Sequence, residues 1–148
     1  MRLATWNVNS VKQRVPRLLP WLDERSPDVV CLQETKLADD AFRDLLDAEL
    51  SARGYEVAVH GEATWNGVAI LSRVGLEDVA IGLDGAPGFP DPEARAVSAT
   101  CGGIRMVSVY VPTGASRAPS TTSTSSPGWG RCATRSPRRP SRRSCAAT

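Results

Sequence analysis

Residues 28–36 read DVVCLQETK, an apolar run that ends in a carboxylate and an ammonium two positions apart. From Asp28 to Leu32, apolar and β-branched side chains follow one another without alternation, which predicts a strand covered on both faces. Glu34 and Lys36 come directly after this run. Charged side chains in this place indicate either a solvated strand end or a polar site at the edge of a sheet.

The segments around this strand predict an alternation of strands and helices. Residues 2–8 favour a strand, and Ser10 is placed to cap a helix that Pro16 and Pro20 are expected to limit or kink. Residues 38–54 carry apolar side chains at helical spacing and end in glycine, which predicts a second helix. Further strands are expected at Tyr55–His60, Gly67–Ser72, Val79–Leu83, Ala94–Thr100 and Ile104–Val111. This order predicts an α/β domain with a mixed sheet whose helices cover one face.

The composition is that of one globular domain, with 41% hydrophobic and 23% charged residues. No apolar run approaches the roughly 20 residues of a membrane-spanning helix, and no secretory leader is recognisable, so we expect a cytoplasmic protein. The four cysteines show neither a CxxC pair nor zinc-ligand spacing and are expected to be free, buried thiols.

The charge distribution divides the chain at residue 114. Residues 1–114 hold all 16 acidic residues and have a net charge of −5, whereas residues 115–148 hold seven arginines and no acid. The second segment is rich in Ser, Arg and Pro and lacks Leu, Ile, Val and Phe, so we expect it to be a disordered tail. A basic tail that binds nucleic acid through phosphate contacts is the functional alternative.

Two predicted strand ends carry polar side chains, TWNVNS at residues 5–10 and LQETK at residues 32–36. Mg²⁺ prefers oxygen ligands, commonly one or two carboxylates together with amide oxygens, waters and substrate phosphate. Asn7 and Glu34 fit this need if their strands are adjacent. By spacing alone the pair is weak evidence, because a Glu at a strand end is usually solvated and an Asn there usually completes a turn.

Several pieces of the sequence, in order, strengthen the case: TWNVNSVKQR, PDVVCLQETK, WNGVAILSR, EARAV and VSVYVPTG. Together they resemble the N-terminal half of the exonuclease III family, the bacterial AP endonucleases of the endonuclease/exonuclease/phosphatase superfamily. The resemblance spans residues 1–114. It implies a DNase I-like two-sheet α/β sandwich about twice as long as this chain. It also implies a DNA-repair nuclease that hydrolyses phosphodiesters at abasic sites and 3′ ends of duplex DNA.

The resemblance also implies roles for individual residues. Glu34 would hold the catalytic metal, Mg²⁺ or alternatively Mn²⁺, with Asn7 as a nearby amide of the metal site. Lys36 would orient Glu34 or reach a backbone phosphate, because it lies on the same face if the strand continues. Tyr110 matches the family tyrosine whose hydroxyl lies against the scissile phosphate.

Other positions are expected at the rim of the site or away from it. The resemblance places Asn9, Arg14, Trp65 and Asn66 on a DNA-binding rim, where amides and Arg meet phosphates and an aromatic ring packs on a sugar or base. At Thr113 the family usually has an amide residue, which puts the expected loop contact in doubt. The only histidine, His60, is expected to be structural.

The later motifs of the family, G-D-x-N and S-D-H, do not occur in residues 115–148. These motifs position the attacking water and polarise the base, so we expect a truncated and inactive nuclease whose tail arises from a shifted reading frame. We also expect the sheet built by residues 1–114 to lack its facing sheet and the chain to be marginally stable. A phosphatase or phosphodiesterase acting on non-DNA phosphates, and a non-catalytic nucleic-acid-binding protein that uses the tail, are the two alternative functions.

Overall fold

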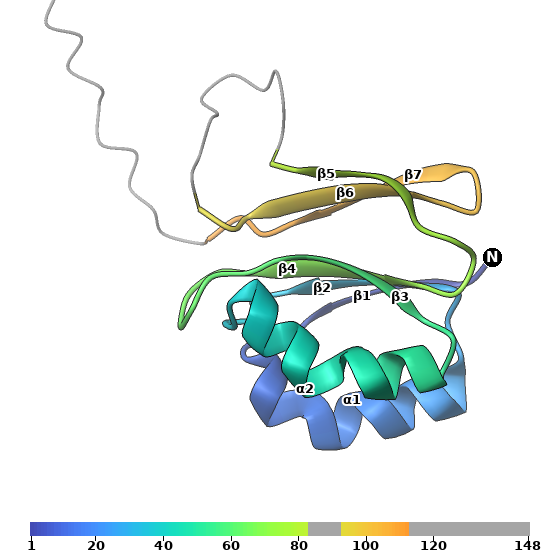
Figure 1. Cartoon of the computed structure of the whole chain (residues 1–148), viewed down its shortest axis with the longest axis horizontal. Helices are drawn as coiled ribbons and strands as arrows, with labels where there is room; N and C mark the ends of the chain where they lie inside the picture. Colours follow the sequence, from blue (N-terminus) through green and yellow to red (C-terminus); the bar gives the residue numbers. More distant parts are fainter. Residues whose placement is uncertain (83–92, 113–148) are drawn as a thin grey trace, which may run out of the picture. The chain divides into compact units, whose positions relative to one another are not determined.

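The computed structural model describes residues 1–82 and 93–112 of the chain. The chain divides into two units, Met1–Gly114 and Ala115–Thr148, and the described residues belong to the first. Along this unit the elements are β1 (Leu3–Asn7), α1 (Val11–Arg25), β2 (Val29–Gln33), α2 (Asp39–Ala52), β3 (Glu56–His60), β4 (Val68–Ser72), β5 (Glu77–Ile81), β6 (Ala96–Cys101) and β7 (Ile104–Val109). Figure 1 shows them arranged as two sheets and a pair of helices.

The first sheet is mixed, as predicted, with the strand order β1-β2-β4-β3. β1 and β2 are parallel, with Asn7 opposite Gln33, and α1 is the crossover between them. β4 is antiparallel to both β2 and β3. Because the parallel strands β1 and β2 end at the same edge, the polar residues that follow them are brought together there.

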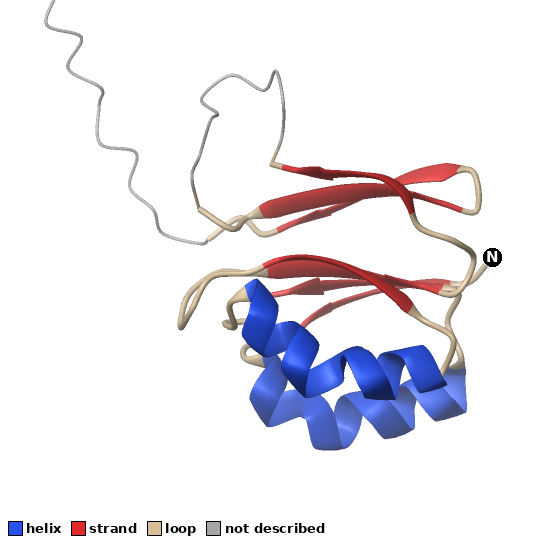
Figure 2. Ribbon diagram, viewed as in Figure 1, coloured by secondary structure: helices blue, strands red, loops and turns tan. Residues whose placement is uncertain are grey.

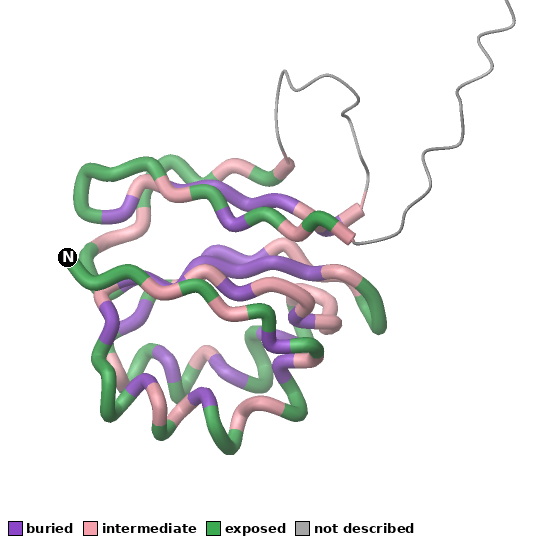
Figure 3. The backbone as a smooth tube through the Cα atoms, turned by 180° about the vertical axis from the view of Figure 1, so that it is seen from behind, coloured by how far each residue is buried: buried purple, intermediate pink, exposed green. Residues whose placement is uncertain are grey.

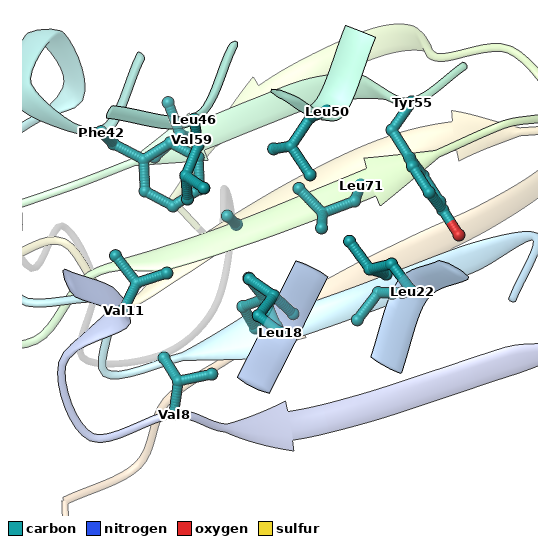
Figure 4. Packing of buried hydrophobic residues seen from close by; sticks show 13 residues of the cluster. Val8, Val11, Leu18, Leu22, Phe42, Leu46, Leu50, Tyr55, Val59 and Leu71 are labelled. Atoms are coloured by element: carbon teal, nitrogen blue, oxygen red, sulfur yellow. The ribbon is translucent and has the colours of Figure 1, made fainter. Parts of the chain in front are cut away.

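Both helices cover the same face of this sheet (Figure 2). Each helix buries one stripe of apolar side chains: Val11, Leu18 and Leu22 from α1, and Phe42, Leu46 and Leu50 from α2. These side chains meet Val30, Leu32, Val59 and Leu71 of the sheet in a single buried cluster (Figure 4). The prediction of helices on one face is confirmed.

The other face of the mixed sheet packs against a second, antiparallel sheet with the order β5-β6-β7. Buried residues from both sheets form one cluster, including Ile70 of β4 and Val97 and Ala99 of β6. In Figure 3 the buried segments lie mainly on the strands where the two sheets face each other. Our expectation of a sheet without a facing partner is therefore wrong, because residues 77–109 already supply three strands of the opposing layer.

Several local expectations also change. Ser10 precedes α1, but its side chain makes no capping hydrogen bond, since its backbone has a positive φ of 82°. α1 runs through Pro16 and Pro20 to Arg25, and both prolines lie on its exposed side, where water can satisfy the carbonyls that lose a partner. β5 starts two residues earlier than predicted and contains a register shift, and the predicted strand end Leu83 lies outside the described residues.

In residues 1–82 and 93–112, neither helix is long and apolar enough to cross a membrane.

Candidate active site at the ends of β1 and β2

The turn after β2 has an unusual backbone that is held from two sides. Glu34 and Lys36 both have a φ of 54°, a left-handed conformation that non-glycine residues adopt at a cost of about 1–2 kcal/mol. From the β1–α1 connection, backbone N–H groups donate to the carbonyls of Glu34 and Thr35 at 2.8 and 3.0 Å. The backbone N–H groups of Thr35 and Lys36 donate to the carbonyls of Gly67 and Asn66, both at 3.1 Å. Neighbouring segments thus impose a geometry that the turn would not adopt alone.

This turn directs the side chains of Glu34 and Lys36 to the same place. Lys36 Nζ lies 3.2 Å from Glu34 Oε2, and both side chains are partly buried. We predicted this proximity from a continuing strand, but β2 ends at Gln33, so the pair forms through the left-handed turn instead. Between them, the Thr35 side chain is fully buried, and its hydroxyl has no hydrogen-bond partner among the described residues.

Asn7 orients the Glu34 carboxylate. Its Nδ2 donates to Glu34 Oε1 at 2.8 Å, while its Oδ1 accepts from the backbone N–H of Asn9 at 3.1 Å. The hydrogen bond from Asn7, supported by the hydrogen bond and charge of Lys36, lowers the pKa of Glu34. Glu34 is therefore held as a carboxylate.

Tyr110 reaches the same carboxylate from the second sheet. It follows β7, packs on the cluster between the sheets, and hydrogen-bonds Glu34 through its hydroxyl. Burial, together with the charge of Glu34, raises the pKa of Tyr110, so the phenol stays protonated. Asn7, Glu34, Lys36 and Tyr110 come from three separate segments of the chain, and the fold brings them into one cluster.

The four residues expected at the rim are placed differently from one another. Asn9 joins the cluster, because its Oδ1 accepts from Lys36 Nζ at 2.6 Å. Trp65 is 69% exposed in the β3–β4 connection, and Arg14 is partly exposed on the first turn of α1. Asn66 uses its amide N–H groups inside the protein: Nδ2 donates to Glu62 at 3.2 Å and to Glu93 at 2.9 Å. His60 lies at the end of β3 with Nδ1 3.2 Å from the Ala96 carbonyl oxygen, so its ring links the two sheets.

Our reading of the sequence assigned no role to Glu93 or Arg95, although the EARAV piece contains both. Glu93 Oε2 accepts from Arg95 Nε at 2.7 Å and also pairs with Arg95 Nη2. The charge of Arg95 lowers the pKa of Tyr110, against the effects of burial and Glu34. A Glu-x-Arg pattern at the start of a strand was the available signal. Thr113 lies outside the described residues.

The donor set is compatible with a hard divalent cation. Glu34 supplies one ionised carboxylate at an accessible strand edge, and Mg²⁺ sites often use one or two carboxylates with waters and substrate phosphates. The described residues contain no group of three or more His, Cys, Asp or Glu side chains that could enclose a metal. Asn7 turns its amide nitrogen, not its oxygen, toward Glu34. The arrangement thus fits a cation that is shared with a substrate better than one enclosed by protein.

Comparison with known proteins identifies the family. The sequence model of the endonuclease/exonuclease/phosphatase family matches residues 4–146. The chain belongs to the endonuclease/exonuclease/phosphatase family. This match continues past residue 114, and the domain boundary expected there stays a prediction.

Three members of the family illustrate the similarity. Exodeoxyribonuclease III of Haemophilus influenzae is 31% identical over 126 residues, which cover 80% of this chain and 44% of that protein. The structure of the 3′-5′ exonuclease NExo from Neisseria meningitidis is 41% identical with a TM-score of 0.67, and the alignment covers 74% of this chain and 41% of NExo. NExo bound to a product DNA hairpin, with the same scores, is described as a 3′ phosphatase.

An AP endonuclease from Archaeoglobus fulgidus is 40% identical with a TM-score of 0.66, covering 76% of this chain and 41% of that one. These structures confirm the two-sheet α/β fold that the resemblance to exonuclease III implied. The chain spans less than half the length of each of these relatives.

Proposed function

We propose that the site built by Asn7, Glu34, Lys36 and Tyr110 binds a phosphodiester of duplex DNA, at an abasic site or a 3′ end, in a metal-dependent DNA-repair nuclease. The observation that carries the proposal is the convergence on one carboxylate: Asn7, Lys36 and Tyr110 all contact Glu34. The similarity to exodeoxyribonuclease III and to AP endonucleases supports DNA as the substrate.

Glu34 and substrate phosphate would hold the metal, Mg²⁺ or Mn²⁺, which when bound supplies Lewis-acid stabilisation of charge on a phosphoryl oxygen. The chain's own residues prepare for it. Asn7 and Lys36 keep Glu34 ionised. The single proton of the Tyr110 hydroxyl is directed to Glu34 in the free site, and it would turn to a phosphate oxygen when substrate binds. Among the described site residues no group is placed as a general base for water. We propose that the described site binds and polarises the phosphate and does not by itself complete hydrolysis.

A test uses the 148-residue chain and a duplex with one abasic site, compared with an intact duplex. The variant is Glu34→Gln, and the control is Glu77→Gln, which changes an exposed carboxylate on β5. With Mg²⁺, Glu34→Gln is expected to weaken binding about tenfold or more, about 1.4 kcal/mol. With EDTA present, Glu34→Gln is expected not to weaken DNA binding and can strengthen it. Without a metal, the variant only removes a negative charge that repels the phosphate.

Two results would reject the proposal: affinity independent of Mg²⁺, or an equal effect of Glu77→Gln. Equal affinity for both duplexes would reject the abasic site as the target and leave the 3′ ends, which both duplexes carry. Cleavage of the abasic duplex by the wild type, lost in Glu34→Gln, would show that the described site completes hydrolysis after all.

A second candidate is removal of a 3′-terminal phosphate from DNA. The observation that favours it is the 41% identity to NExo, whose DNA complex is described as that of a 3′ phosphatase. A duplex with a 3′-phosphate end, tested beside the abasic duplex, distinguishes the two substrates. The non-DNA phosphatase, the nucleic-acid-binding role of residues 115–148 and the cytoplasmic location stay predictions.

A further inference from the structure

Arg95 directly precedes β6, Tyr110 directly follows β7, and the two residues lie opposite each other. In the register of β6 and β7, Ala96 is opposite Val109 and Val97 is opposite Ser108. One step further, the backbone N–H of Tyr110 donates to the Arg95 carbonyl at 2.8 Å, so this pairing continues beyond the strands. Side chains directly opposite each other in an antiparallel pair have Cβ atoms about 5 Å apart on the same face.

That face is the one turned toward the first sheet. Side chains alternate along a strand, so Arg95 shares a face with Val97 and Ala99, which are buried between the sheets. Tyr110 shares the face of Ser108, whose Oγ donates to the Leu32 carbonyl of β2 at 3.0 Å. The guanidinium of Arg95 thus belongs to the same space between the sheet ends as the Tyr110 phenol and the Glu34 carboxylate.

Arg95 is held in this place by hydrogen bonds to Glu93, which is itself bound to Asn66 of the β3–β4 connection. Glu93 Oε2 accepts from Arg95 Nε at 2.7 Å and from Asn66 Nδ2 at 2.9 Å. The backbone N–H of Gly67 donates to the Ala94 carbonyl at 2.8 Å. Only 23% of the Arg95 side chain is exposed. A guanidinium held in a fixed plane loses little entropy when it binds an anion, and its forked donors suit phosphate.

We propose that Arg95 binds a non-bridging oxygen of the substrate phosphate beside Tyr110, and that Glu93 and Asn66 are positioning residues that hold its guanidinium. The site then presents two cationic side chains: Lys36 from the turn after β2, and Arg95 from the residue before β6. Glu34 and Tyr110 belong to the same site. The inference rests on the proposed function for the identity of the phosphodiester, and it assigns to Asn66 a supporting role in place of direct DNA contact.

The test measures two ligands with the whole chain: inorganic phosphate, against sodium chloride of equal ionic strength, by thermal shift, and the abasic duplex by fluorescence anisotropy. The variants are Arg95→Gln and Arg95→Lys. The control is Arg105→Gln, because Arg105 lies on the same sheet but is bound to Ser98 Oγ and the Asp78 carbonyl on its opposite face.

Arg95→Gln is expected to lower the affinity for both ligands about ten- to hundredfold, because it removes a hydrogen bond between charged groups. Arg95→Lys is expected to recover part of the phosphate affinity, and Arg105→Gln to leave both unchanged. If Arg95→Gln does not fold, the comparison rests on Arg95→Lys, which keeps the charge but loses the fork.

The inference is overturned if the Arg95 variants bind both ligands like the wild type, or if Arg105→Gln weakens them equally. It also fails if the wild type does not bind phosphate. Phosphate binding that depends on Arg95, together with duplex affinity that depends on neither Mg²⁺ nor Glu34, would reject the proposed function and keep the inference. Preference for the abasic duplex that depends on Glu34 but not on Arg95 would reject the inference and keep the proposed function.

Discussion

A Cβ added at Gly67 would collide with the turn that carries Glu34 and Lys36. Gly67 has a φ of +87°, and an ideal Cβ there would approach Thr35 Oγ1 far inside the 3.0 Å that real Cβ atoms keep. The next neighbours, Lys36 N and Thr35 Cβ, lie at 3.2 and 3.4 Å and are tolerable. We therefore expect Gly67→Ala to be strongly destabilising, mainly through a single oxygen atom.

The magnitude has two parts. Placing alanine at this φ costs about 1–2 kcal/mol. Overpacking a buried position adds about 1–3 kcal/mol, giving a loss of about 2–5 kcal/mol in the free energy of unfolding. Gly75 is the matched control, since it has a φ of +90° with nothing within 4 Å of its added Cβ, so Gly75→Ala should show only the first part.

A double-mutant cycle isolates the collision. Thr35→Ala removes Oγ1, which has no hydrogen-bond partner within residues 1–82 and 93–112, together with the buried Cγ2 methyl group, so this change alone should cost about 1 kcal/mol for the lost methyl group. In the Thr35→Ala background, the destabilisation caused by Gly67→Ala should be smaller by about 1–3 kcal/mol than in the wild type. Urea unfolding followed by circular dichroism measures this difference. Additivity within about 0.5 kcal/mol, or an equal loss for Gly75→Ala, would refute the reasoning.

Two further predictions concern the links between layers. Ser108→Ala removes a buried hydroxyl that donates to the Leu32 carbonyl at 3.0 Å and accepts from Gln33 Nε2 at 3.3 Å. This change should lower the free energy of unfolding by about 1–3 kcal/mol. The control Ser26→Ala, on an exposed helix end, should change the free energy of unfolding little. Tyr55, which donates to the Pro27 carbonyl at 2.7 Å, has a pKa raised above its ordinary value by burial. Its stabilising contribution is present below pH of about 10 and lost as pH rises through the folded-state pKa, so Tyr55→Phe should flatten the alkaline fall in stability; an unchanged alkaline profile would contradict this.

The sequence was most informative where one physical rule dominated. Unbroken apolar residues at Val29–Leu32 predicted a doubly covered strand, and helical spacing of Phe42, Leu46 and Leu50 predicted α2, because burial alone sets these patterns. The backbone at Glu34 and Lys36 could not be predicted, since its left-handed residues are imposed by hydrogen bonds from segments distant in sequence.

The strands of the second sheet were predicted, but their placement as the facing layer was missed for a related reason. β6 and β7 read as ordinary strands, and nothing local states which face they cover. That information lies in pair contacts such as Ser108 with Leu32, 76 residues apart. The arrangement of Arg95 opposite Tyr110 was equally hidden, because it depends on the register of two strands that only the folded chain defines.

This separation along the chain has a consequence for folding kinetics. The mixed sheet and its helices are encoded by residues 3–72, and β6 and β7 pair across a short local connection. Each layer can gain structure early, but Glu34 belongs to one and Tyr110 to the other, and closing long loops slows late contacts. The hydroxyl–carboxylate contact therefore forms only when the layers dock, which makes it a reporter of the final step of assembly, after most secondary structure is in place.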